Sequence, residues 1–290
     1  MLDLVTGYDC NVKCDYCTIT DEMRCRSLST EDIVSALEQG RRRGHEHVRF
    51  GGGEPTIRPD LIKLVRASRT LGYPDIEIQS NGLRYAHAAY TKALVDAGVN
   101  RFSISVMSDD AELYEKVVGF PKARELVLAG IRHLVRHDVD IVADVIMKHD
   151  TYRRLPSLVG FYAERGVPAF VLWLVSLSDR NADFPESLVP VREMYPFIKS
   201  AIEEGKRHGV SVMSRHIPLC MLPGLEEHLV DTTNEDVTIV TPDETFDLRD
   251  SAISANSYGE NCERCSQRPR CAGIRQDYLK AMGDEELLPL

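Results

Sequence analysis

Short runs of apolar and β-branched residues recur along most of the chain, and each is followed by a stretch with helical spacing. Alternation of this kind is typical of parallel βα units. The pattern predicts six strands, near Leu2 to Thr6, His47 to Phe50, Asp75 to Gln79, Arg101 to Val106, Asp140 to Met147 and Ala169 to Val175. We therefore expect an α/β fold built from six such units.

The segments between the predicted strands carry helix signals. In the clearest, Ser29 can cap the helix, Ile33 and Leu37 share one face, and Gly44 can end it. Further helices are predicted at Pro59 to Leu71, Tyr90 to Ala97, Lys122 to His137, Leu155 to Arg165 and Val191 to His208. Each of these ends close to a glycine or a charged turn, as a crossover helix should.

The pattern changes after Val210. Three further elements are predicted there: a strand up to Met213, a hairpin formed by Val237 to Val240 and Thr245 to Leu248, and a helix from about Gly273 to Ala281. We therefore divide the chain into a βα domain, residues 1–209, and a smaller domain, residues 210–290.

Composition narrows the class of protein. The formal charge of −10, from 35 basic and 45 acidic residues, argues against a surface that binds long stretches of nucleic acid. The sequence has no signal-like start and no run of eighteen apolar residues, so neither secretion nor a membrane span is expected. The chain is predicted to be cytoplasmic.

The cysteines are clustered along the chain. A chain of 290 residues can bury a large core, so it does not need disulfide bonds or metal ions to be stable. Three lie at Cys10, Cys14 and Cys17, and three more at Cys262, Cys265 and Cys271, whereas Cys25 and Cys220 are single. Cytosolic cysteines are mostly reduced, so clustering of this kind suggests metal binding.

The first group follows the first strand directly. Thiolates hold iron–sulfur clusters, and a cubane with three protein ligands keeps one iron open to another molecule. A structural zinc site needs a fourth ligand, which is absent nearby, although a distant Cys or His could supply it. The spacing therefore favours an open cluster at the carboxyl end of the strand, where barrel enzymes place their sites.

The segment Cys10-Asn-Val-Lys-Cys14-Asp-Tyr16-Cys17 resembles the signature of the radical S-adenosylmethionine (SAM) superfamily. Gly52-Gly53-Glu54-Pro55, after the second predicted strand, is similar to the family's Gly-Gly-Glu-Pro segment, which contacts the amino group of bound methionine. The resemblance implies a partial (β/α)6 TIM-type barrel with a [4Fe-4S] cluster and SAM. It also implies a flavodoxin- or ferredoxin-type electron donor and cleavage of SAM to a 5′-deoxyadenosyl radical.

The resemblance also implies roles for single residues. Tyr16 matches the residue beside the adenine, while Asn81 and Ser105 lie at strand ends that face the cofactor or substrate. Asp144, on an apolar strand, is the first candidate to reach the ribose, or else it makes a structural hydrogen bond or salt bridge. Gly52 and Gly53 would allow close backbone approach, and Asn81 could equally belong to a plain turn.

The second cysteine group resembles the auxiliary-cluster region called SPASM or twitch, which makes the smaller domain an iron–sulfur domain. Full SPASM modules have another cysteine where Arg275 stands, so we expect one auxiliary [4Fe-4S] cluster at most. Cys220 could complete it. The alternatives are substrate as the fourth ligand, a structural zinc, or ligation by His216. Such a cluster could anchor substrate, accept an electron or only hold the fold.

Three functions remain open from the sequence. The leading one is a radical enzyme acting on a small biosynthetic intermediate, such as a sugar, aminocyclitol or amino-acid derivative, because the chain begins almost at the first strand without a leader-binding domain. The others are a peptide maturase and a metal-stapled binding or electron-transfer protein without catalysis. Candidates for an acid, a base or a hydrogen donor are Glu77, Asp144, Trp173, Arg215, His216 and Cys25.

Overall fold

A computed structural model describes residues 1–230, 236–250 and 257–290 of the chain. Its strands are β1 (Leu2–Val5), β2 (His47–Gly51), β3 (Asp75–Ser80), β4 (Arg101–Ser105), β5 (Asp140–Met147), β6 (Ala169–Leu174), β7 (Ser211–Arg215), β8 (Thr238–Val240) and β9 (Thr245–Asp247). They form one sheet in the order β7-β6-β5-β4-β3-β2-β1-β8-β9. All neighbours are parallel except β8 and β9, which form an antiparallel hairpin.

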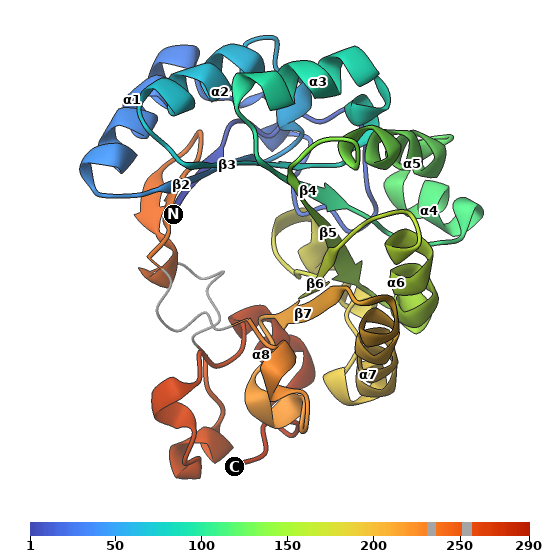
Figure 1. Cartoon of the computed structure of the whole chain (residues 1–290). Helices are drawn as coiled ribbons and strands as arrows, with labels where there is room; N and C mark the ends of the chain where they lie inside the picture. The colour runs from blue at the N-terminus through green and yellow to red at the C-terminus, as the bar shows by residue number, and fades with distance from the viewer. Residues whose placement is uncertain (231–235, 251–256) are drawn as a thin grey trace.

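The helices cover the outer face of this curved sheet (Figure 1). They are α1 (Thr30–Arg42), α2 (Leu61–Thr70), α3 (Ala88–Ala97), α4 (Ala111–Val118), α5 (Ala123–Leu134), α6 (Leu155–Ala163) and α7 (Val191–His208). A short helix, α8 (Gln276–Met282), lies in the C-terminal part, beyond the β7 edge. The arrangement is a partial barrel with its inner face open on one side.

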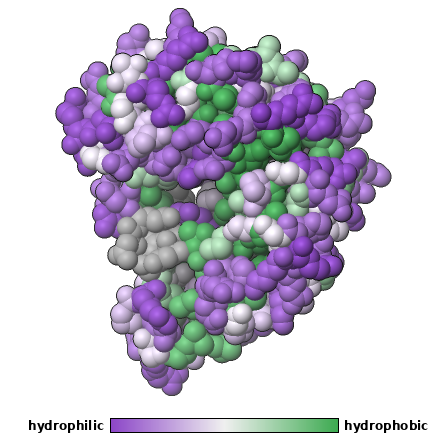
Figure 2. Space-filling model, viewed as in Figure 1, coloured by the Kyte–Doolittle hydropathy of each residue, from purple (hydrophilic) through white to green (hydrophobic). Residues whose placement is uncertain are grey.

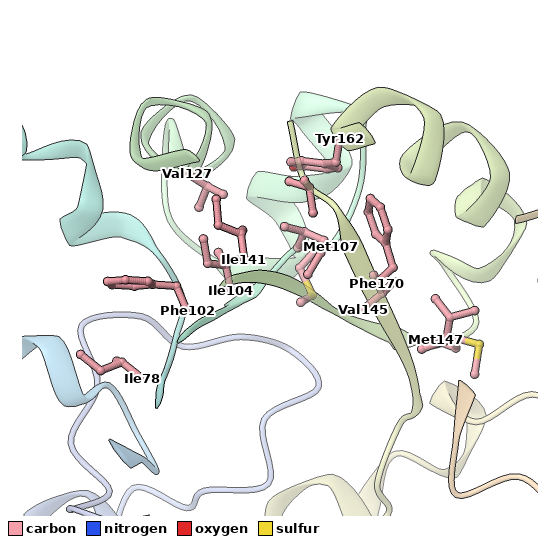
Figure 3. Packing of buried hydrophobic residues seen from close by; sticks show 14 of the residues in the cluster. Ile78, Phe102, Ile104, Met107, Val127, Ile141, Val145, Met147, Tyr162 and Phe170 are labelled. Carbon is pink, nitrogen blue, oxygen red and sulfur yellow. The ribbon is translucent and has the colours of Figure 1, made fainter. Parts of the chain in front are cut away.

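The core lies between the strands and the outer helices, because alternate strand residues point outward. In Figure 3, Ile104 of β4 lies close to Ile141 of β5, with Val127 of α5 above them, and Phe102 lies further along β4. These side chains are at most 4% exposed. The period-2 alternation of each strand thus places its apolar residues under the helices.

The residues that alternate with this core point to the inner face, and many of them are polar. Asp3, Arg49 and Glu77 lie side by side on β1, β2 and β3. The Arg49 guanidinium forms an ion pair with the Asp3 carboxylate, and Glu77 is 6% exposed. A polar inner face is unusual for a filled barrel and provides groups for binding.

The predicted fold class is confirmed. Each of the six predicted strands agrees with the structure to within one residue at either end, and the hairpin after residue 237 is present. Two differences stand out: α4 occupies a segment for which we predicted no helix, and α8 begins three residues later than expected, because Ile274 first pairs with Ser257.

Residues from the predicted smaller domain extend the barrel sheet at both edges. β7 pairs with β6, and β8 pairs with β1 through Leu2 and Thr238. The division at residue 209 therefore separates segments that share one sheet, and it stays a prediction.

The surface over the outer helices is mainly hydrophilic, and hydrophobic residues show largely between them in Figure 2. In the described part of the chain, we find no helix with the length and apolarity that crossing a bilayer requires.

Candidate functional site

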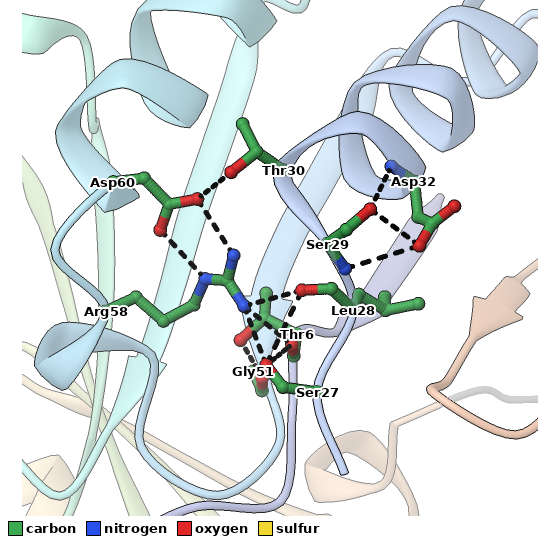
Figure 4. A network of polar contacts seen from close by, with 9 residues as sticks. All are labelled: Thr6, Ser27, Leu28, Ser29, Thr30, Asp32, Gly51, Arg58 and Asp60. Atoms are coloured by element: carbon green, nitrogen blue, oxygen red, sulfur yellow. Dashed lines mark hydrogen bonds and ion pairs between the residues drawn. The ribbon is translucent and has the colours of Figure 1, made fainter.

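The first cysteine group lies in a long loop between β1 and α1, which we call the cluster loop (residues 6–28). Its two ends are held together, since the Leu28 N–H donates to the Thr6 carbonyl at 3.1 Å. Figure 4 shows that Arg58 clamps both ends: its Nη1 donates to Thr6 O (3.1 Å), Leu28 O (3.0 Å) and Ser27 Oγ (2.9 Å). Asp60 binds the same guanidinium through two hydrogen bonds, so the clamp is itself fixed.

Cys10, Cys14 and Cys17 of the cluster loop are partly buried and close enough to affect one another electrostatically. Burial, and then the charge of Cys17, raise the pKa of the Cys14 thiol to about 12. Burial also raises the pKa of Cys10. Three thiolates here would repel one another, and bound iron would offset that repulsion. The donor set therefore fits a cationic centre.

Three basic side chains hold the cluster loop, Arg24 from within it and Arg180 and Lys148 from outside. Arg24 donates to the carbonyl of the first cysteine at 3.3 Å, and Arg180 donates to that of the second at 2.9 Å. Lys148, which is 5% exposed, donates to Asp15 Oδ2 at 3.0 Å from the end of β5. Sequence reasoning missed all three, and only Lys148, directly after an apolar strand, carried a visible signal.

The Gly-Gly-Glu-Pro segment packs against the cluster loop. Gly53 N donates to Gly7 O and Glu54 N to Asp9 O, both at 2.8 Å. A Cβ on Gly53 would lie 2.1 Å from Asp9 O, and Gly52 has a φ of +112°. The close approach predicted for these glycines is therefore made to the backbone of the cluster loop.

The Glu54 side chain is 2% exposed and joins the ends of β2 and β3. Its carboxylate accepts four hydrogen bonds, from Thr56 N (3.0 Å) and Oγ1 (2.5 Å), Ser80 Oγ (2.8 Å) and Asn81 N (2.7 Å). Burial raises its pKa, although these hydrogen bonds oppose the rise. A carboxylate has about four acceptor positions, so these four donors occupy those of Glu54, and the binding of an ammonium group by Glu54 stays a prediction.

Asn81 reaches the first cysteine. Its Nδ2 lies 3.9 Å from Cys10 Sγ and donates to Asn11 Oδ1 at 2.8 Å. Gly82 follows with a φ of +77° and turns the chain away from the loop. The segment expected to face the cofactor therefore borders the first cysteine.

Asp144 lies on the inner face of β5 and is 5% exposed. It accepts from Gln79 Nε2 at 2.8 Å and from Trp173 Nε1 at 2.9 Å, and burial raises its pKa. Ser105 is its neighbour on β4, where the Ser105 carbonyl accepts from Tyr114 OH at 3.0 Å. The structure thus shows the structural hydrogen bonds that we considered for Asp144, and a contact with ribose stays a prediction.

Glu77 is tied into the same inner face. Its carboxylate lies 2.8 Å from His47 Nε2 and accepts from Ser103 Oγ at 2.7 Å. Burial alone would raise its pKa, but the His47 hydrogen bond and the Arg49 charge outweigh burial and lower it to about 2. A carboxylate that stays ionised in this way is suited to holding the barrel together.

A cavity of about 420 Å³ opens on the inner face, between the cluster loop and the ends of β6 and β7. Its lining includes Tyr16, Cys17, Gly52, Trp173, Arg215 and His216. Burial raises the pKa of Tyr16. The predicted adenine neighbour, Tyr16, and three candidate groups from distant parts of the chain therefore surround one space.

His216 has an unusual place in this cavity. Its φ of +64° is a conformation that non-glycine residues rarely adopt, and its ring lies 5.5 Å from that of Trp173. Burial, followed by the charge of Arg215, lowers its pKa to about 3, so the imidazole is neutral. Among the residues that the structure describes, its buried Nδ1 finds no hydrogen-bond partner.

Cys25, another candidate hydrogen donor, does not line this cavity. It is exposed and donates to the Glu22 carbonyl.

The second cysteine group forms a separate site. Cys220, Cys262, Cys265 and Cys271 line one small cavity together with Tyr258. Burial, and then the charge of Cys271, raise the pKa of Cys220 to about 11. The fold therefore brings Cys220 next to Cys262, Cys265 and Cys271, as we expected from the number of cysteines. His216, the alternative ligand, lines the cavity of about 420 Å³ instead.

Within residues 1–230, 236–250 and 257–290, no three His, Cys, Asp or Glu side chains are grouped so as to hold a single metal ion. A four-iron cluster spreads its thiolate ligands wider than one ion does. The cysteines of either group can therefore hold a four-iron cluster without lying as close together as the ligands of a single metal ion do.

Comparison with known proteins adds a family to this geometry. A family model described as the radical SAM superfamily matches residues 4–161. A protein named "Probable GTP 3′,8-cyclase" from Sulfurisphaera tokodaii is 25% identical over 204 residues, 69% of this chain and 64% of that protein. One of the same name from Saccharolobus islandicus (strain M.14.25 / Kamchatka #1) is 34% identical over 142 residues, 49% of this chain and 44% of that protein. The chain thus spans less than two thirds of these relatives.

Solved structures agree on the fold. Streptococcus suis SuiB bound to S-adenosylmethionine has a TM-score of 0.73 at 13% identity, over 100% of this chain and 76% of that one. The protein anSMEcpe with bound AdoMet has a TM-score of 0.71 at 17% identity, and the match covers 100% of this chain and 93% of that one. At these identities, the likeness concerns architecture alone.

Proposed function

The chain belongs to the radical SAM superfamily, and on that premise we propose that Cys10, Cys14 and Cys17 hold its [4Fe-4S] cluster and that its substrate is a small polar molecule. Its cofactors are the cluster and SAM, and it is an enzyme, so the hypothesis of a protein without catalysis is dropped. When bound, these cofactors supply a 5′-deoxyadenosyl radical. The task of the chain is to position a substrate C–H bond and to exclude other hydrogen donors.

The residues around the first cysteines would divide this task. Gly52 and Gly53 allow β2 to approach the cluster loop, and Glu54 fixes Asn81 beside Cys10. SAM would then lie along the ends of the first strands, with the methionine beside Glu54 and the adenine beside Tyr16. Asp144, held by two N–H donors, would orient the inner wall that faces the ribose.

The size and lining of the cavity carry the substrate proposal. The cavity of about 420 Å³, part of which the adenine of SAM beside Tyr16 would occupy, lies within the range of about 300 to 1,000 Å³ that is common for small-molecule sites. Polar groups line it, including Arg49 of β2, Arg215 of β7 and His216, next to apolar side chains such as Ile146, Leu174 and Ile239. A small molecule with several hydroxyl or anionic groups fits such a lining better than an extended peptide does.

A peptide substrate is the second candidate. Solved forms of the structural neighbours are named as SuiB bound to precursor peptide SuiA and as anSMEcpe with bound AdoMet and a peptide. The relatives in sequence are named for GTP, a small molecule. We propose the small molecule because the cavity and the relatives in sequence agree, and a flavodoxin- or ferredoxin-type protein as electron donor.

We further propose that Cys220, Cys262, Cys265 and Cys271 hold an auxiliary [4Fe-4S] cluster. Their common cavity supports this assignment. Cys220→Ala should lower the iron content below about eight per chain, the content expected for two cubanes. An unchanged content would remove Cys220 from the ligand set.

The function is tested by 5′-deoxyadenosine release from anaerobically reconstituted protein, with dithionite, SAM and a candidate substrate. GTP deuterated on its ribose is the first candidate, and the measurement is deuterium transfer into 5′-deoxyadenosine. Cys14→Ala is the control and should release none. Acceleration by peptides alone would overturn the small-molecule proposal, and release from Cys14→Ala would overturn the cysteine assignment.

A further inference from the structure

The last residues of the chain cross the second cysteine group. We call Leu287–Leu290 the tail segment. Leu287 is 2% exposed and anchors it in the core, and Leu288 and Pro289 line the same cavity as the four cysteines. The side chains of Leu288 and Leu290 are 59% and 50% exposed. The tail segment therefore turns its backbone, rather than these two side chains, toward the sulfurs.

One backbone N–H group of the tail segment donates to a cysteine sulfur. Leu290 N lies 3.5 Å from Cys265 Sγ, whereas the Leu288 N–H donates to the Glu286 carbonyl at 3.1 Å. The register is fixed by Ser266, whose N and Oγ both donate to the Leu290 carbonyl, at 3.0 and 2.6 Å. The Leu290 N–H is thus held in place by a contact that does not involve sulfur.

Hydrogen bonds to the sulfurs and solvent exposure are among the factors that set the reduction potential of an iron–sulfur cluster. An N–H donor favours the reduced state, because that state carries more negative charge on its sulfurs. The tail segment supplies one such donor, the Leu290 N–H, and lines the cavity with Leu287, Leu288 and Pro289. Its backbone therefore acts on the electronic state of whatever the cysteines hold.

We propose that the tail segment is a backbone cap for the auxiliary cluster, which donates the Leu290 N–H to the Cys265 thiolate and shields the cluster from solvent. This inference rests on the proposed auxiliary cluster. With four protein ligands and a cap, the cluster has no coordination position for substrate. It serves in electron transfer or in holding the fold, and substrate binds in the larger cavity.

The test uses the full chain with Cys10, Cys14 and Cys17 replaced by alanine, so that only the auxiliary cluster is observed after reconstitution. About four iron atoms per chain are expected. In this background, Leu290→Pro removes the N–H, since proline has none, and Leu290→Ala keeps it. The midpoint potential is measured by a redox titration followed by electron paramagnetic resonance.

Leu290→Pro should make reduction of the cluster about tenfold less favourable, a shift of about 59 mV toward negative potential for a one-electron couple. Leu290→Ala should leave the potential unchanged. Equal potentials in all three proteins, or equal shifts in both variants, would overturn the cap. If the protein without Cys10, Cys14 and Cys17 binds no iron while its tail segment is unchanged, the proposal of an auxiliary cluster is overturned instead.

A second measurement examines shielding. A chain that ends after Glu286 lacks the tail segment, and its cluster should bleach several-fold faster in air than that of the 290-residue chain, as followed by visible absorbance. Circular dichroism checks that both proteins are folded. An unchanged bleaching rate in a folded, iron-loaded protein would show that the tail segment does not shield the cluster.

Discussion

Replacing Gly53 with alanine is expected to empty the first cysteine group of iron. The added Cβ would lie 2.1 Å from the Asp9 carbonyl oxygen and 2.6 Å from the Tyr8 carbonyl carbon. Non-bonded contacts between heavy atoms are most favourable near about 3.5 Å, so the cluster loop would have to retreat by roughly 1 Å. Both obstacles are backbone atoms, which cannot turn aside as a flexible side chain can.

The cost of this retreat can be worked from the contacts that it breaks. The hydrogen bonds from Gly53 N to Gly7 O and from Glu54 N to Asp9 O would be lost, at a net cost of about 1 kcal/mol each. Overpacking typically costs about 1 to 3 kcal/mol. The total is below the stability of about 5 to 15 kcal/mol of a typical folded protein. The variant should therefore fold with a displaced cluster loop.

The assay is the iron content after anaerobic reconstitution, together with SAM cleavage. Gly53→Ala should fall from about eight iron atoms per chain to about four, because the auxiliary site is distant, and it should release no 5′-deoxyadenosine. Gly51→Ala is the matched control, since its Cβ would meet Gln79 Oε1 at an ordinary 3.5 Å. Full iron content and wild-type SAM cleavage in Gly53→Ala would refute the reasoning.

Two further predictions concern the inner face. Glu77 has a pKa lowered from 4.5 to about 2, so its interaction with His47 and its neighbours contributes about 3 kcal/mol of stability above pH 4.5, which is lost as the pH falls toward 2. Glu77→Gln should therefore lower the free energy of urea unfolding by about that amount at pH 7 and by much less at pH 3, and an equal difference at both values would contradict the assignment. Asp144→Asn turns an amide N–H toward Gln79 or Trp173, both of which are donors. It should therefore lower the free energy of urea unfolding by about 1 to 3 kcal/mol. An unchanged free energy of unfolding would show that these donors find other partners.

The strands were predictable because each repeats a buried, β-branched pattern between turn signals, and Asp140–Met147 agrees at both ends. Helix α4 was missed although its signal was present. Asp110 caps it by accepting from Leu113 N at 2.8 Å, and Gly119 ends it with a φ of +68°. Its eight residues were too short for a clear apolar period, and the cap was the better guide.

The candidate site was predictable where spacing along the chain brings ligands together, as it does for Cys10, Cys14 and Cys17. Cys220 was placed by counting cysteines, and its approach to Cys271 depends on tertiary structure that the sequence does not state. Arg58, which clamps the cluster loop, could not have been found. An arginine among loop residues has no pattern, and its partners lie about 30 and 50 residues earlier.

The pairing of β8 with β1 has a consequence for synthesis. Thr238 lies beside Leu2, so β1 remains an edge strand on one side until β8 has been made. Loop closure over such a distance carries an entropic cost, and non-local contacts of this kind slow folding. The contacts that hold the cluster loop, from Gly53, Arg58 and Arg180, come from residues that precede β8 in the chain. The cluster loop can therefore be held in place before this edge of β1 is covered, and covering that edge is the later step of folding.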